Sequence, residues 1–257
     1  PSPVMTTASP RRKPSRAVEP VADDQSGLLD LLDRDRSLLA FNERVLAMVT
    51  RDEVPLLERL RYLCIVSSNL DELFEVRMAP HLHAARSGPG GSQAFDQIAA
   101  AAHALVERQY AIYNDVLIPQ FQRCGIEIVA HGERNAEQRR WVQSYFRKEV
   151  RPLLVPVSLD PSHPFPMVAN KSLNFIVRLE GKDAFGRQNE VAIVKVPRVL
   201  ARVIALPDRV SGKGRRFVSL SSVIRAHLHE LFPGRVVVQF SQFRVTRNSD
   251  LAVQEAD

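Results

Sequence analysis

The spacing of apolar residues changes near Cys124 and Gly125, and this change restricts the chain to a mixed architecture. From about residue 27 to residue 124, apolar residues recur every three or four positions, which is the period of an amphipathic helix. After Gly125, short β-rich runs are separated by prolines and glycines, a pattern typical of strands and turns. The sequence therefore predicts an α+β chain with a helical region, 27–124, followed by a mixed α/β region, 125–257.

Three long helices are expected in the first region, each with one apolar stripe. The first stripe is predicted at Leu38, Phe41, Val45 and Val49, the second at Leu57, Leu60, Cys64, Ser67 and Leu70 with Phe74 or Met78, and the third at Phe95, Ile98, Ala102, Leu105, Gln109 and Ile112. Asp35 or Ser37 is the expected cap of the first helix. The segment 87–92, which is rich in glycine, is the expected loop before the third helix. Short connections between long helices favour an antiparallel three-helix bundle.

The second region is predicted to alternate strands and helices. Its expected elements are a strand at 126–129, a helix capped by Asn135, a hairpin of strands at 173–179 and 190–196, a helix at 218–232, and two final strands at 235–240 and 242–246. This region is expected to form one α/β domain.

Composition excludes some classes of protein. The hydrophobic fraction is 45%, which excludes a wholly disordered chain. Residues 1–26 are rich in Pro, Ser, Ala and Arg and are predicted to form a disordered basic tail. An apolar run of about 20 residues, as a membrane-spanning helix needs, is missing from the sequence, and a segment of signal-peptide type is missing too. A cytoplasmic location is therefore expected. Cys64 and Cys124 lie in apolar surroundings and are interpreted as reduced core thiols.

Basic charge is concentrated in one short stretch. The formal net charge is +6, and residues 198–216 hold six basic residues against one acidic residue. The Ser-Gly-Lys-Gly-Arg-Arg sequence at 211–216 predicts a flexible basic loop. Arg215 and Arg216 are candidate contacts for a phosphate-rich ligand or for an acidic neighbouring subunit, and a solvated surface loop is the alternative. Phe217 is the one aromatic residue beside the loop, so a specific nucleic-acid site is not predicted.

A second unusual segment, Ser67-Ser-Asn-Leu-Asp-Glu72, places polar residues inside a predicted helix. Ser, Asn and Asp compete with the helical backbone for hydrogen bonds and are unfavourable inside helices. Asn69 is the candidate binding residue here, because an amide can both donate to and accept from the edge of an adenine base. A polar contact between two helices is the alternative.

Two other motifs contain candidate polar groups. The turn 160–166 pairs Asp160 with His163, either as an acid and base or as an Asx-type turn, which its prolines favour. In 243–250, Arg244 and Arg247 are candidate phosphate ligands, with salt bridges to nearby acids as the commoner alternative. Glycine-rich phosphate loops and zinc motifs are missing from the sequence, and His81 and His83 are wrongly spaced for one helical face, so no metal site is predicted.

Five segments together resemble one known family. Residues 37–46, 55–63 and 67–77 resemble the amino-terminal helical domain of bacterial polyphosphate kinase, and residues 160–166 and 243–248 resemble the head domain that follows it. Their order and rough spacing agree with the family from about Leu28 to the end. The family usually has a tryptophan where this chain has Leu38.

The resemblance implies reversible transfer of the terminal phosphate of ATP to inorganic polyphosphate, through a phosphohistidine and with magnesium. It implies that Asn69 contacts the ATP base, and that the head domain forms subunit contacts in a homo-oligomer. It also places the family's catalytic histidines and phosphate-binding arginines in two further domains that 1–257 does not contain. We therefore expect no catalytic residue and no metal ligand in this span. In particular, His163 is not expected to take the role of a catalytic histidine, because it belongs to a different motif. The hypothesis is a cytoplasmic or peripherally membrane-bound enzyme truncated before its catalytic domains and inactive alone. The alternative is a non-catalytic basic module that binds polyphosphate or RNA, or that drives oligomerisation.

Overall fold

A computed structural model describes residues 34–87, 89–160, 165–182, 186 and 190–247. The predicted tail at 1–26 and His163 lie outside these ranges.

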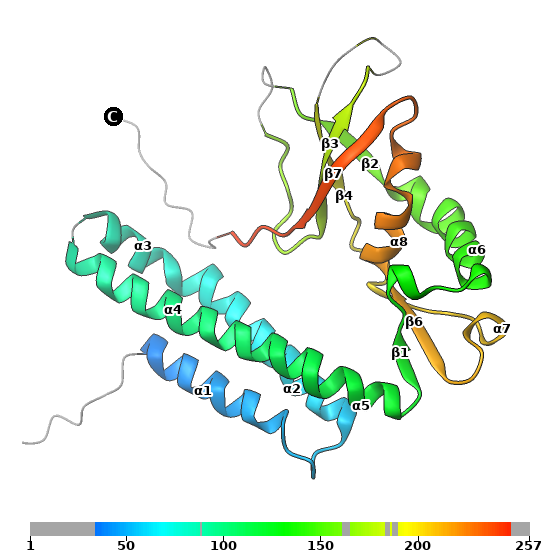
Figure 1. The fold of residues 1–257 in the computed structure, drawn as a ribbon. Helices are drawn as coiled ribbons and strands as arrows, with labels where there is room; N and C mark the ends of the chain where they lie inside the picture. Colours follow the sequence, from blue (N-terminus) through cyan, green and yellow to red (C-terminus); the bar gives the residue numbers. More distant parts are fainter. Residues whose placement is uncertain (1–33, 88, 161–164, 183–185, 187–189, 248–257) are drawn as a thin grey trace, which may run out of the picture. The chain divides into compact units, whose positions relative to one another are not determined.

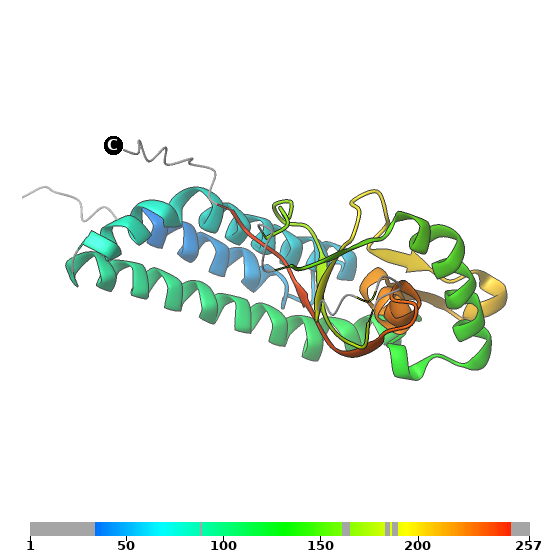
Figure 2. The same ribbon diagram turned by 90° about the horizontal axis from the view of Figure 1, so that it is seen from above.

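The helical region consists of three helical rods that run side by side in alternating directions (Figures 1 and 2). The first rod is α1 (Arg34–Met48). The second joins α2 (Leu56–Glu72) to α3 (Met78–Ser87), and the third joins α4 (Pro89–Ala111) to α5 (Ile118–Arg123). They share one core, whose fully buried members include Val49, Val66, Leu73, Leu105 and Leu117. The predicted antiparallel three-helix bundle is confirmed.

Three π-helical turns each lie just before a proline. A π-helical turn at Leu73–Arg77 precedes Pro80, and another at Ile112–Leu117 precedes Pro119. A third π-helical turn, Phe146–Val150, precedes Pro152. Proline has no N–H, and its ring clashes with the carbonyl group four residues earlier. A wider turn just before the ring is one way for a helix to pass a proline without breaking, as π-bulges do elsewhere.

Two of the three predicted stripes are wrong in their rotation about the helix axis. The third is confirmed, since Ile98, Ala102, Leu105 and Gln109 are buried. In the first two rods, however, Phe41 is 46% exposed and Leu57 is 63% exposed, and Cys64 and Ser67 are exposed as well.

The cause is that two polar residues occupy the inner faces. Asn42 is fully buried in α1, and Arg59 is 3% exposed in α2. The Arg59 Nε donates to the Val49 carbonyl over 2.5 Å, and its Nη1 donates to Gln120 over 2.8 Å. A stripe built from apolar residues alone omits buried polar groups that find hydrogen-bond partners inside the bundle. Cys64 and Cys124, which the sequence placed in the core of this region, are both exposed, so their interpretation as core thiols is wrong.

The helix ends also differ from expectation. The chain is already helical at Arg34, so Asp35 and Ser37 lie inside α1 and do not cap it. The Asp35 carboxylate instead contacts His81 at 2.8 Å and Arg77 at 3.4 Å. The loop predicted at 87–92 is shorter, since α3 extends to Ser87 and α4 starts at Pro89, a residue that suits the first turn of a helix.

The α+β region contains two sheets among the described residues. The first has the order β1-β6-β5, with β1 (Ile126–Ile128) parallel to β6 (Arg215–Ser219) and β5 (Val203–Ala205) antiparallel to β6. The second is fully antiparallel, in the order β2-β4-β3-β7. Its strands are β2 (Val155–Ser158), β3 (Asn174–Glu180), β4 (Val191–Lys195) and β7 (Val236–Phe243).

Helices cover one face of the larger sheet. Figure 1 shows α6 (Ala136–Tyr145) and α8 (Leu220–His227) on one side of it. The core between them contains Phe146, Phe175, Val194, Ile224 and Leu228. The remaining short elements are a four-residue helix, α7 (Asp208–Ser211), and 3₁₀ turns at His131–Glu133, Arg151–Leu153 and Leu228–Leu231.

Local signals in this region predicted most elements correctly. The Asn135 side chain caps α6 by accepting from the backbone N–H of Gln138 over 2.8 Å, and β3 and β4 form the expected antiparallel pair. The two final strands are wrong as separate elements, because one strand, β7, runs from Val236 through Ser241 to Phe243.

Candidate functional site

Asn69 is held by a side chain of the neighbouring rod. Its Nδ2 donates to the Oδ1 of Asn42 over 2.7 Å, and the Asn42 Nδ2 donates to the carbonyl of Leu38 over 3.0 Å. This bond is the contact between helices that the sequence allowed as the alternative for Asn69. It also orients the half-buried Asn69 amide, and it leaves the Asn69 Oδ1 and one N–H without a protein partner among the described residues.

The polar helix segment contacts the α+β region, 125–257, which we term the head, through a set of charged and amide groups. We term this set the polar seam, and it comprises Asp71, Glu75, Asn170, Lys171 and Arg244. The Arg244 guanidinium donates to both carboxylate oxygens of Asp71, over 2.7 and 3.1 Å. The Lys171 Nζ lies 2.6 Å from a Glu75 carboxylate oxygen, and the Asn170 amide donates to the same carboxylate. Two motifs far apart in the sequence, at 67–72 and 243–250, are therefore joined by a bidentate ion pair.

The backbone around Lys171 supports the seam. Lys171 has a φ of 55°, and its N–H donates to the Val245 carbonyl over 2.8 Å. The backbone N–H of Arg247 donates to the Asn170 Oδ1 over 3.0 Å. The hydrogen bond from Lys171 lowers the pKa of the Glu75 carboxyl group most strongly, and the hydrogen bond from Asn170 lowers it further. The Glu75 side chain is therefore ionised in the folded chain at neutral pH.

The basic segment forms a turn followed by a strand, so the loop predicted at 211–216 is shorter: Arg215 and Arg216 belong to β6, and residues 212–214 alone lie outside regular structure. Ser211 ends α7, and the residues that follow Gly214 pair with β1. The Arg216 Nε donates to Glu127 over 2.8 Å, and its Nη1 donates to the Ser211 carbonyl over 2.9 Å. Arg215 is exposed, and its side chain has no ion pair among the described residues.

The remaining candidates are not brought to a common point. The side chain of Arg247 is exposed and makes no hydrogen bond or ion pair within the described ranges. His81 pairs with Asp35, and its spacing to His83 does not create a cluster. In the part of the chain that the structure describes, no three His, Cys, Asp or Glu side chains converge to hold a metal ion. The described residues therefore offer no cluster of this kind for the magnesium that the family implies.

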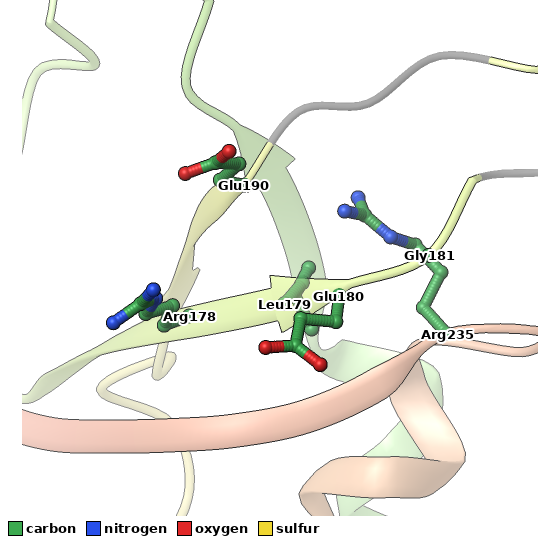
Figure 3. A pocket seen from close by; sticks show the side chains of 6 residues that line it. All are labelled: Arg178, Leu179, Glu180, Gly181, Glu190 and Arg235. Atoms are coloured by element: carbon green, nitrogen blue, oxygen red, sulfur yellow. The ribbon is translucent and has the colours of Figure 1, made fainter.

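A small polar pocket, which the sequence did not indicate, opens at one end of the larger sheet. Figure 3 shows Arg178 and Glu180 on β3, Glu190 just before β4, and Arg235 just before β7 around a cavity of about 210 Å³. Acidic and basic groups alternate around it, and none of the sequence-predicted site residues lines it.

Sequence reasoning missed most of the residues that make these contacts. It selected Asn69 and, within the polar seam, Arg244, but not Asn42, Glu75, Asn170 or Lys171. One signal was available, because Asp71 and Glu75 are four positions apart and lie on one helical face, where paired acids indicate a basic partner. None of the helices among the described residues is long and apolar enough to cross a membrane.

Comparisons with known proteins agree with this architecture. A model of the polyphosphate kinase N-terminal domain matches residues 31–129, and a model of the polyphosphate kinase middle domain matches residues 137–257. Polyphosphate kinase from Neisseria gonorrhoeae is 50% identical over 235 residues, which are 88% of this chain and 34% of the relative. A polyphosphate kinase from Burkholderia cenocepacia is 48% identical over 233 residues, again 88% of this chain and 34% of the relative.

A solved structure supports the same assignment. The crystal structure of polyphosphate kinase from Porphyromonas gingivalis superposes with a TM-score of 0.73 at 30% identity, covering 85% of this chain and 33% of that one. The chain thus spans about a third of the length of the relatives it matches. Both domain models, these relatives and the matching fold lead to one conclusion: the chain belongs to the polyphosphate kinase family, of which it represents an amino-terminal portion.

Proposed function

We propose that this chain is the nucleotide-contacting and subunit-contacting part of an enzyme that transfers the terminal phosphate of ATP to inorganic polyphosphate. Membership of the family supports the overall reaction. The observation that carries the specific role is the Asn42–Asn69 hydrogen bond, because it fixes an amide whose remaining donor and acceptor match the edge of an adenine base.

The fixed amide lowers the cost of binding. Asn42 is fully buried and anchored to its own helix, so Asn69 loses little further side-chain freedom when a base meets it. An adenine edge offers an amino donor for the Asn69 Oδ1 and a ring nitrogen that accepts from its free N–H. A guanine edge presents a carbonyl in place of that amino group, so the same amide favours adenine.

We further propose that the chain alone does not synthesise polyphosphate. Phosphoryl transfer requires several positive groups around the transferred phosphate. Arg216 and Arg244 are instead each engaged with a carboxylate, Glu127 and Asp71 respectively. This engagement also weakens the alternative of a basic module for polyphosphate or RNA, because it occupies two of the four candidate arginines.

Subunit contact through the head and a cytoplasmic location remain predictions that the family resemblance motivates. Of the two adjacent arginines, the exposed Arg215 is the candidate contact for an acidic neighbouring subunit, because Arg216 is already bound to Glu127. Magnesium would have to be held outside the described residues.

The test is a chimera in which this chain replaces the matching part of the N. gonorrhoeae polyphosphate kinase. Asn69→Ala should raise the KM for ATP about tenfold, the effect of losing about 1.4 kcal/mol of binding, with a smaller change in kcat. Asn114→Ala is the matched control, because Asn114 is an exposed helical asparagine without a side-chain partner among the described residues. An unchanged KM in a folded Asn69→Ala chimera would refute the role of Asn69.

A further inference from the structure

A small pocket lies between the second and third rods of the helical region. Its walls come from α2, from α4 and from the π-helical turn Ile112–Leu117, and its volume is about 210 Å³. The lining residues are Leu63, Ser67, Gln109, Tyr110 and Tyr113. All five are uncharged and two are aromatic, so the pocket suits a neutral ring better than a phosphate group.

Gln109 gives this pocket a fixed hydrogen-bond acceptor. The residue is 6% exposed, and its Nε2 donates to the Leu63 carbonyl over 2.8 Å and to the Ser67 Oγ over 2.5 Å. Both of its N–H groups are thereby used, which orients the amide. The Gln109 Oε1 accepts no hydrogen bond from the described residues, yet it keeps accessible surface. Because side-chain polar atoms in protein interiors are normally paired, this acceptor is available to a ligand that enters the pocket.

Ser67 places a donor beside this acceptor. Its oxygen accepts from Gln109, and its own hydroxyl hydrogen has no acceptor among the described residues. A ligand edge that carries an N–H group next to an acceptor atom would therefore meet both side chains at once. Nucleobases present such edges, with an amino group beside a ring nitrogen in adenine and a ring N–H beside a carbonyl in uracil.

Two tyrosines supply aromatic surface for the ring. Tyr110 is 63% exposed, and Tyr113 is half-buried three positions later, so both lie on one side of the helix. Burial raises the pKa of the Tyr113 hydroxyl group, with a smaller rise from the nearby Cys64, so this ring is neutral at physiological pH. Stacking on aromatic side chains accepts any base, because every base has a π face.

The pocket is separate from the proposed contact with ATP. Asn69 is bonded to Asn42 of α1, whereas Ser67 is bonded to Gln109 of α4. Two positions along an α-helix correspond to a rotation of about 200°, so Asn69 and Ser67 point to different sides of α2. The volume of about 210 Å³ is below the range of about 300–1,000 Å³ that drug-sized ligands need, so the pocket holds one base but not a whole nucleotide.

On these grounds we propose that this pocket is a second small-molecule site, which takes the base of a neutral nucleoside. The ring lies against Tyr110 and Tyr113. Its N–H group donates to the Gln109 Oε1, and the neighbouring acceptor atom receives the Ser67 hydroxyl hydrogen. The site goes beyond the proposed function, because it requires neither phosphoryl transfer nor a contact between Asn69 and ATP.

Equilibrium dialysis of the 257-residue chain against radiolabelled adenosine and uridine measures the binding and shows whether a purine or a pyrimidine is preferred. Each nucleoside has a matched probe without the N–H group, N6,N6-dimethyladenosine and 3-methyluridine respectively. These probes should bind about tenfold more weakly, because the hydrogen bond to Gln109 is lost.

Two variants locate the site, and a third is the control. Gln109→Leu and Tyr110→Ala should each weaken binding about tenfold, through loss of the acceptor and of the stacking surface respectively. Tyr110→Ala keeps the test valid if the buried Gln109→Leu variant fails to fold, since Tyr110 is exposed. Asn69→Ala is the matched control on the other side of α2, and its affinity for the nucleoside should be unchanged.

The two native cysteines give a second readout. Cys64 is exposed and follows Leu63 directly, whereas Cys124 is exposed and lines another cavity, with Arg59 and Gln120. The chain is treated with iodoacetamide, and alkylation of each cysteine is followed by mass spectrometry. At about ten times its dissociation constant, the nucleoside should slow alkylation of Cys64 about tenfold and leave that of Cys124 unchanged.

Binding of neither nucleoside overturns the proposal, and so does binding that Tyr110→Ala leaves at full strength. Equal slowing of alkylation at Cys64 and Cys124 would also contradict it. Loss of binding in Asn69→Ala alone would place the nucleoside on the other side of α2, which refutes the second site while it supports the proposed function.

Discussion

Replacing Gly214 with alanine should destabilise the head more than any other Gly→Ala change considered below. Gly214 has a φ of 97°, a conformation that L-residues avoid, and lies beside Gly125 where β1 and β6 come together. A Cβ at residue 214 would lie 2.7 Å from the Gly125 carbonyl oxygen. That oxygen is backbone and already accepts from the N–H of Arg215 over 2.8 Å, so it cannot move aside without weakening the start of the β1–β6 pair.

The magnitude follows from two separate costs. A residue with a side chain in a left-handed conformation costs roughly 1–2 kcal/mol. Forcing an extra carbon into a packed position costs roughly 1–3 kcal/mol. Gly214→Ala should therefore lower the free energy of unfolding by about 2–5 kcal/mol. Gly234 has a φ of 79° with open space around its Cβ position, so Gly234→Ala carries the first cost alone.

Urea unfolding followed by circular dichroism measures these differences in the 257-residue chain. Gly132→Ala completes the series, because Gly132 has neither a positive φ nor a close neighbour and its replacement should be neutral or stabilise by about 0.4–1 kcal/mol. The expected order of stability is Gly132→Ala, then Gly234→Ala, then Gly214→Ala. A Gly214→Ala variant no less stable than Gly234→Ala would refute the close approach of the two strands.

Three other predictions concern the seam and the core. A double-mutant cycle of Asp71→Asn and Arg244→Gln should give a coupling free energy of about 0.5–1 kcal/mol that shrinks in 1 M salt, and a coupling of zero at low salt would mean that the ion pair does not join the two motifs. Glu75 has a lowered pKa in the folded chain, so its contribution to stability is present above its ordinary pKa of about 4.5 and is lost as the pH falls through the folded value. The stability difference between wild type and Glu75→Gln, measured by urea unfolding against pH, should therefore shrink below pH 4.5. A difference that grows in acid would contradict the pairing with Lys171. Phe146→Ala should lower the free energy of unfolding by about 3–5 kcal/mol in the same assay, since the ring is fully buried, and a loss under 1 kcal/mol would show that it is not part of the core.

Elements set by neighbouring residues could be predicted from the sequence. Asn135 followed by Gln138 is a capping box, and the structure shows both of its reciprocal hydrogen bonds. The β-rich runs that became β3 and β4 form their hairpin because the alternation of buried residues is local information.

Contacts between distant segments could not be predicted in this way. Arg244 and Asp71 are 173 positions apart, and no local pattern connects them. The predicted stripes are rotated from the real ones because Asn42 and Arg59 are buried, and their polar side chains hydrogen-bond to Asn69 and to the Val49 carbonyl, contacts that no local pattern shows. Arg215 and Arg216 looked alike in sequence, yet only the register of β6 against β1 places Arg216 opposite Glu127.

The most direct test of the account is polyphosphate synthesis from ATP by the N. gonorrhoeae enzyme whose matching 235-residue portion is replaced by this chain. The account predicts that the chimera lengthens polyphosphate with ATP as donor and that the 257-residue chain alone does not. A folded chimera without synthesis, or measurable synthesis by the chain alone, would contradict it.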